Sequence, residues 1–470
     1  MARKRGTVTA FKVDRKYEGV GDLINIETPL MGLATNLDDT KREPTHAFEI
    51  YAIPDLKYGW INVPKEITTN LSTLNFYIDK FPASRIVGVS GNSVRLINTE
   101  TLQELYSYTF SDVTPLFATL MNNISFACMT NASTNPLKVF FWTQNTIKEY
   151  NQTGNCMAFF KGRLFIGNGK TLIFSGASIV DPTFTENPFD SANGGGYIIL
   201  NYPQVTKIYY LISHEDMLYI FTDGGLYLLT VSLASNAPST FYIVETGINL
   251  NFSRAKVFVI ENQMVVLTSV GLFWLRGLNL ERFDWIVADQ ISKLDFTNSG
   301  AGYYQGQKII TIPYREENKS LAYSIEYTQF FYLPYKTTNL IYNSKGASLD
   351  FSSSYITQLF AGTSYYPFNY LSILHDLGTD RFKYIKELKL IGRGNIKADF
   401  IYDNYGLYQS QFYASLGPDL LTFRSALGRK GHKIGLKIYT DTFDENFAFV
   451  SKITMRIHVL GPVNYFYYAR

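Results

Sequence analysis

Short runs of Val, Ile, Leu, Tyr and Phe, separated by residues typical of tight turns, recur along most of this 470-residue chain. The clearest pairs of runs lie at residues 162–175, 216–231 and 262–276, and each has Gly, Asp or Asn near its middle. Apolar runs of this length on both sides of such a turn are typical of β-hairpins. The pattern therefore predicts a chain built mainly from hairpins.

The hairpins recur at a nearly regular interval. Equivalent positions in four of them are Leu164, Leu218, Met264 and Lys308, which lie 54, 46 and 44 residues apart. Weaker members of the series lie at 85–96, 124–129 and 355–360. A period of roughly 40–50 residues with several strands per unit is that of β-propeller blades, and five to seven blades would fit. No Trp-Asp or Gly-His pair recurs at fixed positions, so a β-sandwich with irregular loops stays an alternative.

The two ends of the chain have different patterns. From residue 381 onward charged and apolar residues alternate, as in 383–390, which is typical of sheets with one buried and one solvent-exposed face. Widely spaced prolines and polar connections mark the N-terminal region. We therefore predict an all-β protein with these parts: an extended N-terminal arm and first strands at 1–80, a β-propeller-like domain at 81–365, a C-terminal β-sandwich at 380–460 and an aromatic tail at 461–470.

Composition agrees with a β-rich fold and narrows the function. Tyr, Phe and Trp make up 16% of the residues, whereas Asp, Glu, Lys and Arg make up only 18%, below the roughly 25% of an average soluble domain. A hydrophobic fraction of 46% excludes bulk disorder. The formal net charge of +3 does not by itself indicate a nucleic-acid or membrane partner. No run of about 18 apolar residues occurs, so no membrane-spanning helix is predicted.

Patterns of catalysis and cofactor binding are weak. The five histidines and two cysteines, Cys128 and Cys156, have no zinc-like spacing, so we predict no metal site and no disulfide scaffold. The stretch 167–171 (GNGKT) lacks the upstream glycine of a phosphate-binding loop and continues as a strand, which indicates a hairpin turn. No GxSxG motif occurs. We therefore predict no catalytic residues, no cofactor and no enzymatic activity.

One acidic pair keeps an alternative open. Glu215 and Asp216 follow His214 in an otherwise apolar hairpin, and some propellers use paired carboxylates to cleave glycosidic bonds. A carbohydrate-binding or carbohydrate-cleaving propeller protein is therefore the alternative function. A solvated turn before a strand is the simpler interpretation of the pair.

Two clusters of basic residues are candidate contact sites. The first cluster contains Arg424, Arg429, Lys430, Lys433 and Lys437, with no acidic residue among them; the second contains Arg3, Lys4 and Arg5. Such clusters could neutralise phosphates without reading base sequence. We predict that the first cluster faces DNA or a neighbouring subunit, and a solvated charged surface is the alternative for both.

Three stretches carry a resemblance to a known family: 160–164 (FKGRL), 380–382 (DRF) and 428–438 (GRKGHKIGLKI). Together with the order of arm, propeller-like middle and C-terminal sandwich, they make the chain similar to the tail hub or nozzle proteins of short-tailed bacteriophages, also called packaged-DNA stabilisation proteins. The resemblance covers most of the chain and includes no catalytic motif.

The resemblance implies a structural role in the virion tail, after assembly in the cytoplasm of the host bacterium. Members of this family form a ring, usually a hexamer, below the portal and adaptor ring, where they retain packaged DNA and conduct it during ejection. A tail needle or plug and fibres or spikes attach to the ring. Non-specific contact with double-stranded DNA in the channel is expected.

A cellular scaffold propeller is the third hypothesis.

Overall fold

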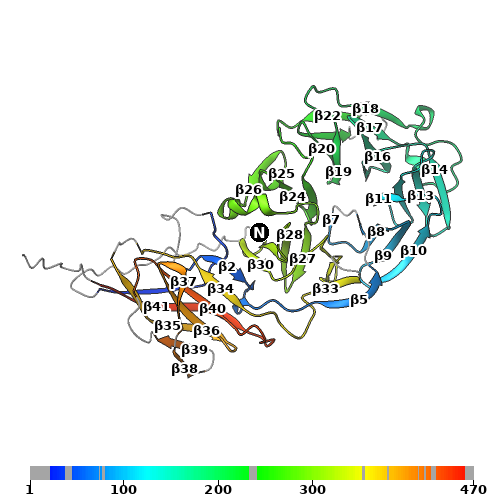
Figure 1. The fold of residues 1–470 in the computed structure, drawn as a ribbon. Coiled ribbons are helices and arrows are strands. Elements are labelled where there is room, and N and C mark those ends of the chain that lie inside the picture. The colour runs from blue at the N-terminus through cyan, green and yellow to red at the C-terminus, as the bar shows by residue number, and fades with distance from the viewer. Residues whose placement is uncertain are drawn as a thin grey trace, which may run out of the picture. The chain divides into compact units, whose positions relative to one another are not determined.

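The computed structural model describes residues 22–36, 45–72, 75–76, 80–231, 241–351, 355–377, 381–410, 412–417, 420–424 and 430–460. It is an all-β protein with a β-propeller-like part, as the sequence predicts (Figure 1). Two compact units make up the chain: unit 1 is Met1–Lys65, Tyr327–Pro334 and Gly362–Arg470, and unit 2 is Glu66–Glu326 and Tyr335–Ala361.

Unit 2 is a succession of seven small sheets, or blades, among the described residues. Blade 1 has β6 (Asn75–Phe76), β8 (Arg85–Ser90), β9 (Ser93–Asn98) and β10 (Gln103–Thr109); blade 2 has β11 (Pro115–Leu120), β12 (Ser125–Thr130), β13 (Leu137–Phe141) and β14 (Thr146–Tyr150); blade 3 has β15 (Cys156–Phe160), β16 (Arg163–Asn168), β17 (Thr171–Phe174) and β18 (Gly196–Ile199). Blade 4 has β19 (Ile208–His214), β20 (Met217–Thr222), β21 (Leu226–Val231) and β22 (Phe241–Glu245).

The later blades follow the same plan. Blade 5 has β23 (Lys256–Ile260), β24 (Gln263–Thr268), β25 (Gly271–Arg276) and β26 (Asn279–Arg282), with β7 (Lys80–Phe81) added in parallel beside β23; blade 6 includes β27 (Gly300–Tyr304), β28 (Gln307–Pro313) and β29 (Ser320–Ser324); blade 7 has β31 (Ile341–Tyr342), β32 (Ser348–Asp350), β33 (Tyr355–Leu359) and β5 (Ile67–Ser72). Among the described residues, three 3-10 helices lie in the connections: η2 (Ala177–Val180), η3 (Ser191–Asn193) and η5 (Trp285–Lys293).

The predicted repeat positions are structurally equivalent. Leu164, Leu218, Met264 and Lys308 are each the second residue of the second strand of blades 3, 4, 5 and 6. In each case a two-residue turn precedes that strand, and the first turn residue has a positive φ, from 46° at Gln305 to 54° at Glu261. Turns of this kind match the twist of paired strands, so they produce a regular repeat without a repeated sequence.

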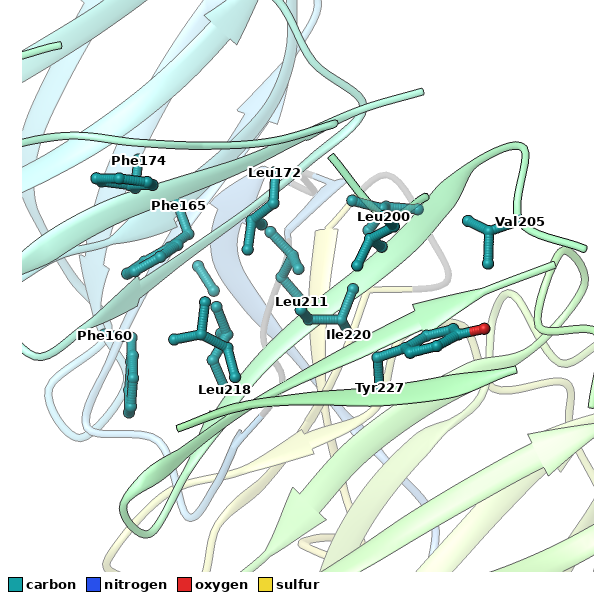
Figure 2. Packing of buried hydrophobic residues seen from close by; sticks show 13 residues of the cluster. Phe160, Phe165, Leu172, Phe174, Leu200, Val205, Leu211, Leu218, Ile220 and Tyr227 are labelled. Atoms are coloured by element: carbon teal, nitrogen blue, oxygen red, sulfur yellow. The ribbon is translucent and has the colours of Figure 1, made fainter. Parts of the chain in front are cut away.

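Neighbouring blades share apolar cores. Between blades 3 and 4, Phe165 and Leu172 meet Leu218 and Tyr227, all of which are almost completely buried (Figure 2). Comparable clusters lie between blades 1 and 2, 2 and 3, and 4 and 5. Since burial of one large apolar side chain contributes about 1.5–3 kcal/mol, these clusters account for the packing of successive blades.

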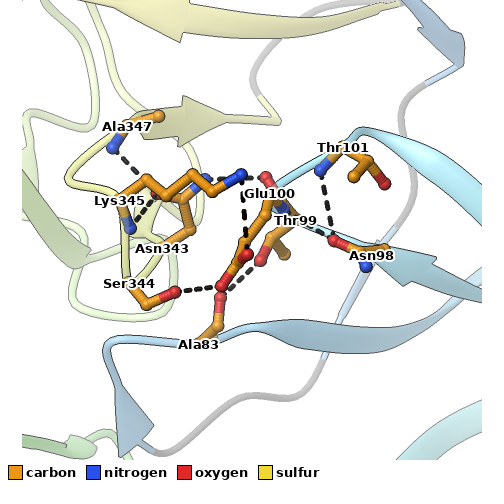
Figure 3. A network of polar contacts seen from close by, with 9 residues as sticks. All are labelled: Ala83, Asn98, Thr99, Glu100, Thr101, Asn343, Ser344, Lys345 and Ala347. Atoms are coloured by element: carbon orange, nitrogen blue, oxygen red, sulfur yellow. Dashed lines mark hydrogen bonds and ion pairs between the residues drawn. The ribbon is translucent and has the colours of Figure 1, made fainter.

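Both ends of unit 2 take part in its closure. The early strand β5 pairs antiparallel with the late strand β33 and completes blade 7. A loop of blade 7 also contacts the β9–β10 turn of blade 1, where Asn343 Nδ2 donates a hydrogen bond to the Thr99 carbonyl at 2.7 Å (Figure 3). Sharing one sheet between the two ends of a propeller removes open edges that would otherwise need protection.

Unit 1 is a β-sandwich, as predicted for the C-terminal region, and N-terminal strands are part of it. One sheet contains β3 (Ile53–Asp55), β4 (Gly59–Ile61), β41 (Phe449–Val459), β35 (Lys383–Arg393), β39 (Leu420–Arg424) and β38 (Phe412–Gly417), with β1 (Asp22–Thr28) also paired to β41; the other contains β2 (Ala47–Tyr51), β34 (Asn369–Ser372), β40 (Ile434–Tyr439), β36 (Lys397–Tyr402) and β37 (Asn404–Ser410). Strand β30 (Gln329–Leu333) also belongs to unit 1. Of the predicted tail at 461–470, nothing lies within the described residues.

Candidate functional site

Three members of the first predicted basic cluster, Lys430, Lys433 and Lys437, lie just before β40 or in it. Lys430 is exposed, and its Nζ lies 5.3 Å from the centre of the Phe382 ring. The Phe382 ring also contacts His432, with 4.0 Å between the two ring centres. The buried Lys383 donates from Nζ to the carbonyls of Arg381 and His432, each at 2.7 Å. Two stretches that carry the family resemblance therefore pack against each other.

The other members of the cluster do not all point to one patch. Lys433 is exposed, and its backbone N–H donates to Asp403 Oδ1 at 3.0 Å. An acidic carboxylate therefore lies next to the backbone of this lysine. Lys437 is half-buried on β40, with Nζ 4.9 Å from the centre of the Tyr439 ring. Arg424 ends β39, and its side chain lies outside the described part of the structure. Arg429, and the second cluster of Arg3, Lys4 and Arg5, also lie outside the described residues.

A more extended basic surface lies on the outward side of β35 and β41, and we call it the basic face. Its cationic residues are Lys386, Lys389, Arg393, Lys452 and Arg456. The two strands are paired over their whole length, with Lys389 opposite Thr454 and Ile391 opposite Lys452. Alternate residues such as Leu388 and Met455 are buried on the opposite side of the sheet. The alternation that predicted a sandwich therefore concentrates positive charge on one side of it.

Within β35 and β41 one acidic residue reduces this charge, and Glu27 of the adjacent β1 is paired with Thr454 in the strand register. Among the described side chains of β35 and β41, Glu387 is the one carboxylate, and its Oε1 lies 3.2 Å from Lys389 Nζ. His458 lies at one end of the face, 5.1 Å from Tyr384 between ring centres. Burial lowers the pKa of His458 below its usual value, and the nearby Lys386 and Arg456 lower it further. The basic side chains therefore act on a common region of the surface.

Two cavities lie between blades of the propeller-like unit. Strands β11, β15, β19 and β23 line a cavity of about 150 Å³, and β7, β8, β11 and β15 contribute to a second of about 420 Å³. Lys80 of β7 lines the second cavity, and the adjacent buried Phe81 packs on Phe258 and Tyr342 at ring-centre distances of 5.6 and 5.8 Å. Neither cavity is large enough for a nucleic-acid duplex.

The acidic pair singled out in the sequence lies on an exposed turn. Glu215 has a φ of 50° between β19 and β20, and its Oε1 is 4.0 Å from His214 Nε2. Asp216 forms an ion pair with Lys161 of the preceding blade, and 83% of its side chain is exposed. A glycosidase needs a second carboxylate across an enclosed cleft. The geometry of this turn favours a solvated ion pair.

The remaining candidates from the sequence are the stretch 167–171, the two cysteines and a possible metal site. Asn168 pairs with Thr171 across a hairpin, which confirms that 167–171 is a turn between β16 and β17. Burial raises the pKa of both Cys128 and Cys156 to about 12, so both thiols are protonated at neutral pH. No group of three or more His, Cys, Asp or Glu suited to a metal occurs within the described part of the chain.

The basic face was not predicted from the sequence, because its residues come from two strands about 60 residues apart. Only clusters of charges that are close together in the sequence were recognised, whereas a strand presents every second residue to the same side. The alternation of cationic and apolar residues in 383–393 and 449–459 is the signal that could have revealed it.

No helix among the described residues is long and apolar enough to span a membrane.

No protein-family model and no curated protein sequence matches the chain. Among solved structures, the chain is similar to the WD40 repeats of RRP9, with 11% identity, a TM-score of 0.40, and coverage of 64% of this chain and 99% of that one. For the Cps50 (Swd1) β-propeller domain of Myceliophteria thermophila the values are 7%, 0.42, 64% and 99%. For a chain of the mitotic checkpoint complex they are 10%, 0.41, 70% and 97%.

Proposed function

We propose that this chain is a structural subunit of the tail of a short-tailed bacteriophage. Copies of it would form a ring, a hexamer by the family resemblance, below the portal and adaptor ring. The ring retains packaged DNA and conducts it during ejection, and it carries the tail needle or plug and the fibres or spikes. The chain acts in the virion tail after assembly in the bacterial cytoplasm, and it acts as a building block and not as an enzyme.

The observation that carries the proposal is the exposure of large apolar side chains on the outermost strands of blades 3 and 4. Strand β18 has no charged residue and exposes Tyr197 and Ile199, while β22 exposes Tyr242 and Val244. The side chains of Tyr197 and Tyr242 are 68% and 57% exposed. Edge strands of monomeric proteins are usually protected by charged residues, and large exposed apolar side chains are typical of interfaces. These edges therefore suit contact with a neighbouring copy.

In this proposal DNA does not pass through the propeller-like unit itself. Because the two cavities between its blades are too small for a duplex, DNA would pass through the opening enclosed by the ring of copies. A ring of near-neutral subunits with localised basic surfaces allows contact with phosphates without strong retention of the moving duplex. The carbohydrate alternative has no comparable support, since Glu215 and Asp216 lie on an exposed turn.

The mass of the purified chain in solution tests the proposal. We expect a closed oligomer, and we expect Tyr197→Ser combined with Tyr242→Ser to weaken it at least tenfold, because burial of each large apolar side chain contributes about 1.5–3 kcal/mol. Phe443→Ser is the control, since Phe443 is even more exposed, at 94%, but lies in a loop of unit 1. A chain that stays monomeric at every concentration, or a double variant that assembles like wild type, would contradict the proposal.

A further inference from the structure

We propose that the basic face of β35 and β41 binds the phosphate backbone of double-stranded DNA without reading its base sequence. This inference rests on the proposed tail function for the choice of DNA among polyanions. The surface itself is assigned from geometry and charge. It lies outside the cluster at 424–437 that the sequence singled out.

The spacing of the cations fits an extended polyanion. Lys389 and Arg393 are four residues apart on β35, and Lys452 and Arg456 are four residues apart on β41. At about 3.4 Å per residue, each pair spans about 14 Å, and the two rows lie about 4.8 Å apart. A DNA duplex carries one negative charge per roughly 1.7 Å of its axis, so about eight phosphate charges accompany this length. Several phosphates can therefore be neutralised at once.

The shape of the face favours the backbone over the bases. Both strands lie in the interior of the seven-stranded sheet, because β39 pairs with β35 on one side and β4 and β1 pair with β41 on the other. The major groove admits a helix or a two-stranded ribbon, and this sheet is wider than either. Contacts from such a surface therefore reach phosphates, which position DNA but carry no sequence information.

The same face does not suit a membrane surface. Protein surfaces that lie on membranes combine basic residues with several apolar side chains that insert among the lipids. Among the described residues of β35 and β41, Ile391 is the one exposed large hydrophobic side chain. The charge complementarity is thus to a polyanion in solution, and DNA is the polyanion that a tail conduit meets.

Glu387 provides a built-in opposing charge. Its carboxylate pairs with Lys389 and lies opposite Arg456 in the strand register. It offsets part of the attraction for phosphates, which is the behaviour that a channel surface needs if DNA is to slide along it. Replacement of Glu387 by Gln should therefore tighten DNA binding and steepen its salt dependence.

The test uses the full chain and a fluorescent 30-base-pair duplex, with affinity measured by anisotropy at several salt concentrations. Each phosphate contact contributes about −0.9 to the slope of log affinity against log salt. Combining Lys389→Ser, Arg393→Ser and Arg456→Ser should reduce the steepness of the slope by about 2.7. The control combines Lys170→Ser, Arg254→Ser and Arg315→Ser, which removes the same charge from exposed positions of unit 2. The control should retain the wild-type slope, and a second duplex of unrelated sequence should bind equally well.

Three results would overturn the inference: an unchanged slope in the basic-face variant, an equal loss in the control variant, or binding to vesicles of anionic phospholipid in preference to duplex DNA. Solution mass is measured on the same variants, so the two proposals can fail separately. A chain that forms the ring but does not bind DNA refutes this inference alone. A chain that binds DNA through this face but never assembles refutes the proposed tail function.

Discussion

Loss of the Asn343 side chain is expected to open unit 2 at the contact between its first and last blades. Asn343 is 3% exposed, donates from Nδ2 to the Thr99 carbonyl at 2.7 Å, and accepts at Oδ1 from the backbone N–H groups of Lys345 and Ala347 at 3.0 and 2.9 Å (Figure 3). Asn343→Ala removes all three bonds and leaves the buried Thr99 carbonyl without this donor. At about 1 kcal/mol per neutral bond, the expected loss of stability is about 3 kcal/mol.

Lys345→Ala is the matched control for this substitution. Its Nζ lies 3.7 Å from Glu100 Oε2 across the same contact, but 65% of its side chain is exposed. An exposed ion pair contributes roughly 0–1 kcal/mol, so its removal should be nearly neutral. The two variants therefore separate a buried hydrogen-bonded contact from a surface attraction at the same place.

Urea unfolding combined with amide hydrogen exchange measures the effect. Asn343→Ala should lower the free energy of unfolding and speed exchange in β5 and β33, because their pairing closes the same blade. A loss below about 0.5 kcal/mol with unchanged exchange would refute the reasoning. An equal loss in Lys345→Ala would also refute it, because the effect would then not depend on burial.

Two further predictions concern buried basic residues in the two units. The Arg163 guanidinium donates to the carbonyls of Ser175 and Gly194, so Arg163→Met should lower the free energy of unfolding by about 3 kcal/mol in a urea titration, and a change within error would contradict this role. Burial, and then His375, lowers the pKa of His46 from 6.5 to about 4, so the unfolded chain takes up a proton there before the folded chain does. Stability should therefore fall as pH falls from 6.5 to 4, by at most about 3 kcal/mol, and equal pH dependence in wild type and His46→Gln would rule out this contribution.

The blade repeat could be predicted from the sequence because it depends on local signals. Two-residue turns such as Lys161-Gly162 and Gln305-Gly306 fix each hairpin, and the flanking apolar runs are contiguous. No local signal specifies that β1 pairs with β41, because more than 400 residues separate them. The pairing of β5 with β33, which closes blade 7, is likewise not specified by any local signal.

The basic surfaces could also be predicted only in part from the sequence. The cluster at 424–437 was visible because its charges are close in sequence, yet Lys433 lies beside Asp403, and Lys437 is half-buried. The basic face needs the pairing of β35 with β41, which only the folded chain shows. The parallel pairing of β7 with β23, about 180 residues away, likewise has no local signal in the sequence.

Electron microscopy of purified phage particles that carry an epitope tag on this chain tests the central proposal most directly. We expect tag density in a symmetric ring at the tail vertex, below the portal and adaptor, with DNA passing through the centre of the ring. Particles without the tag, or a tagged chain found only as single copies outside the tail axis, would contradict it.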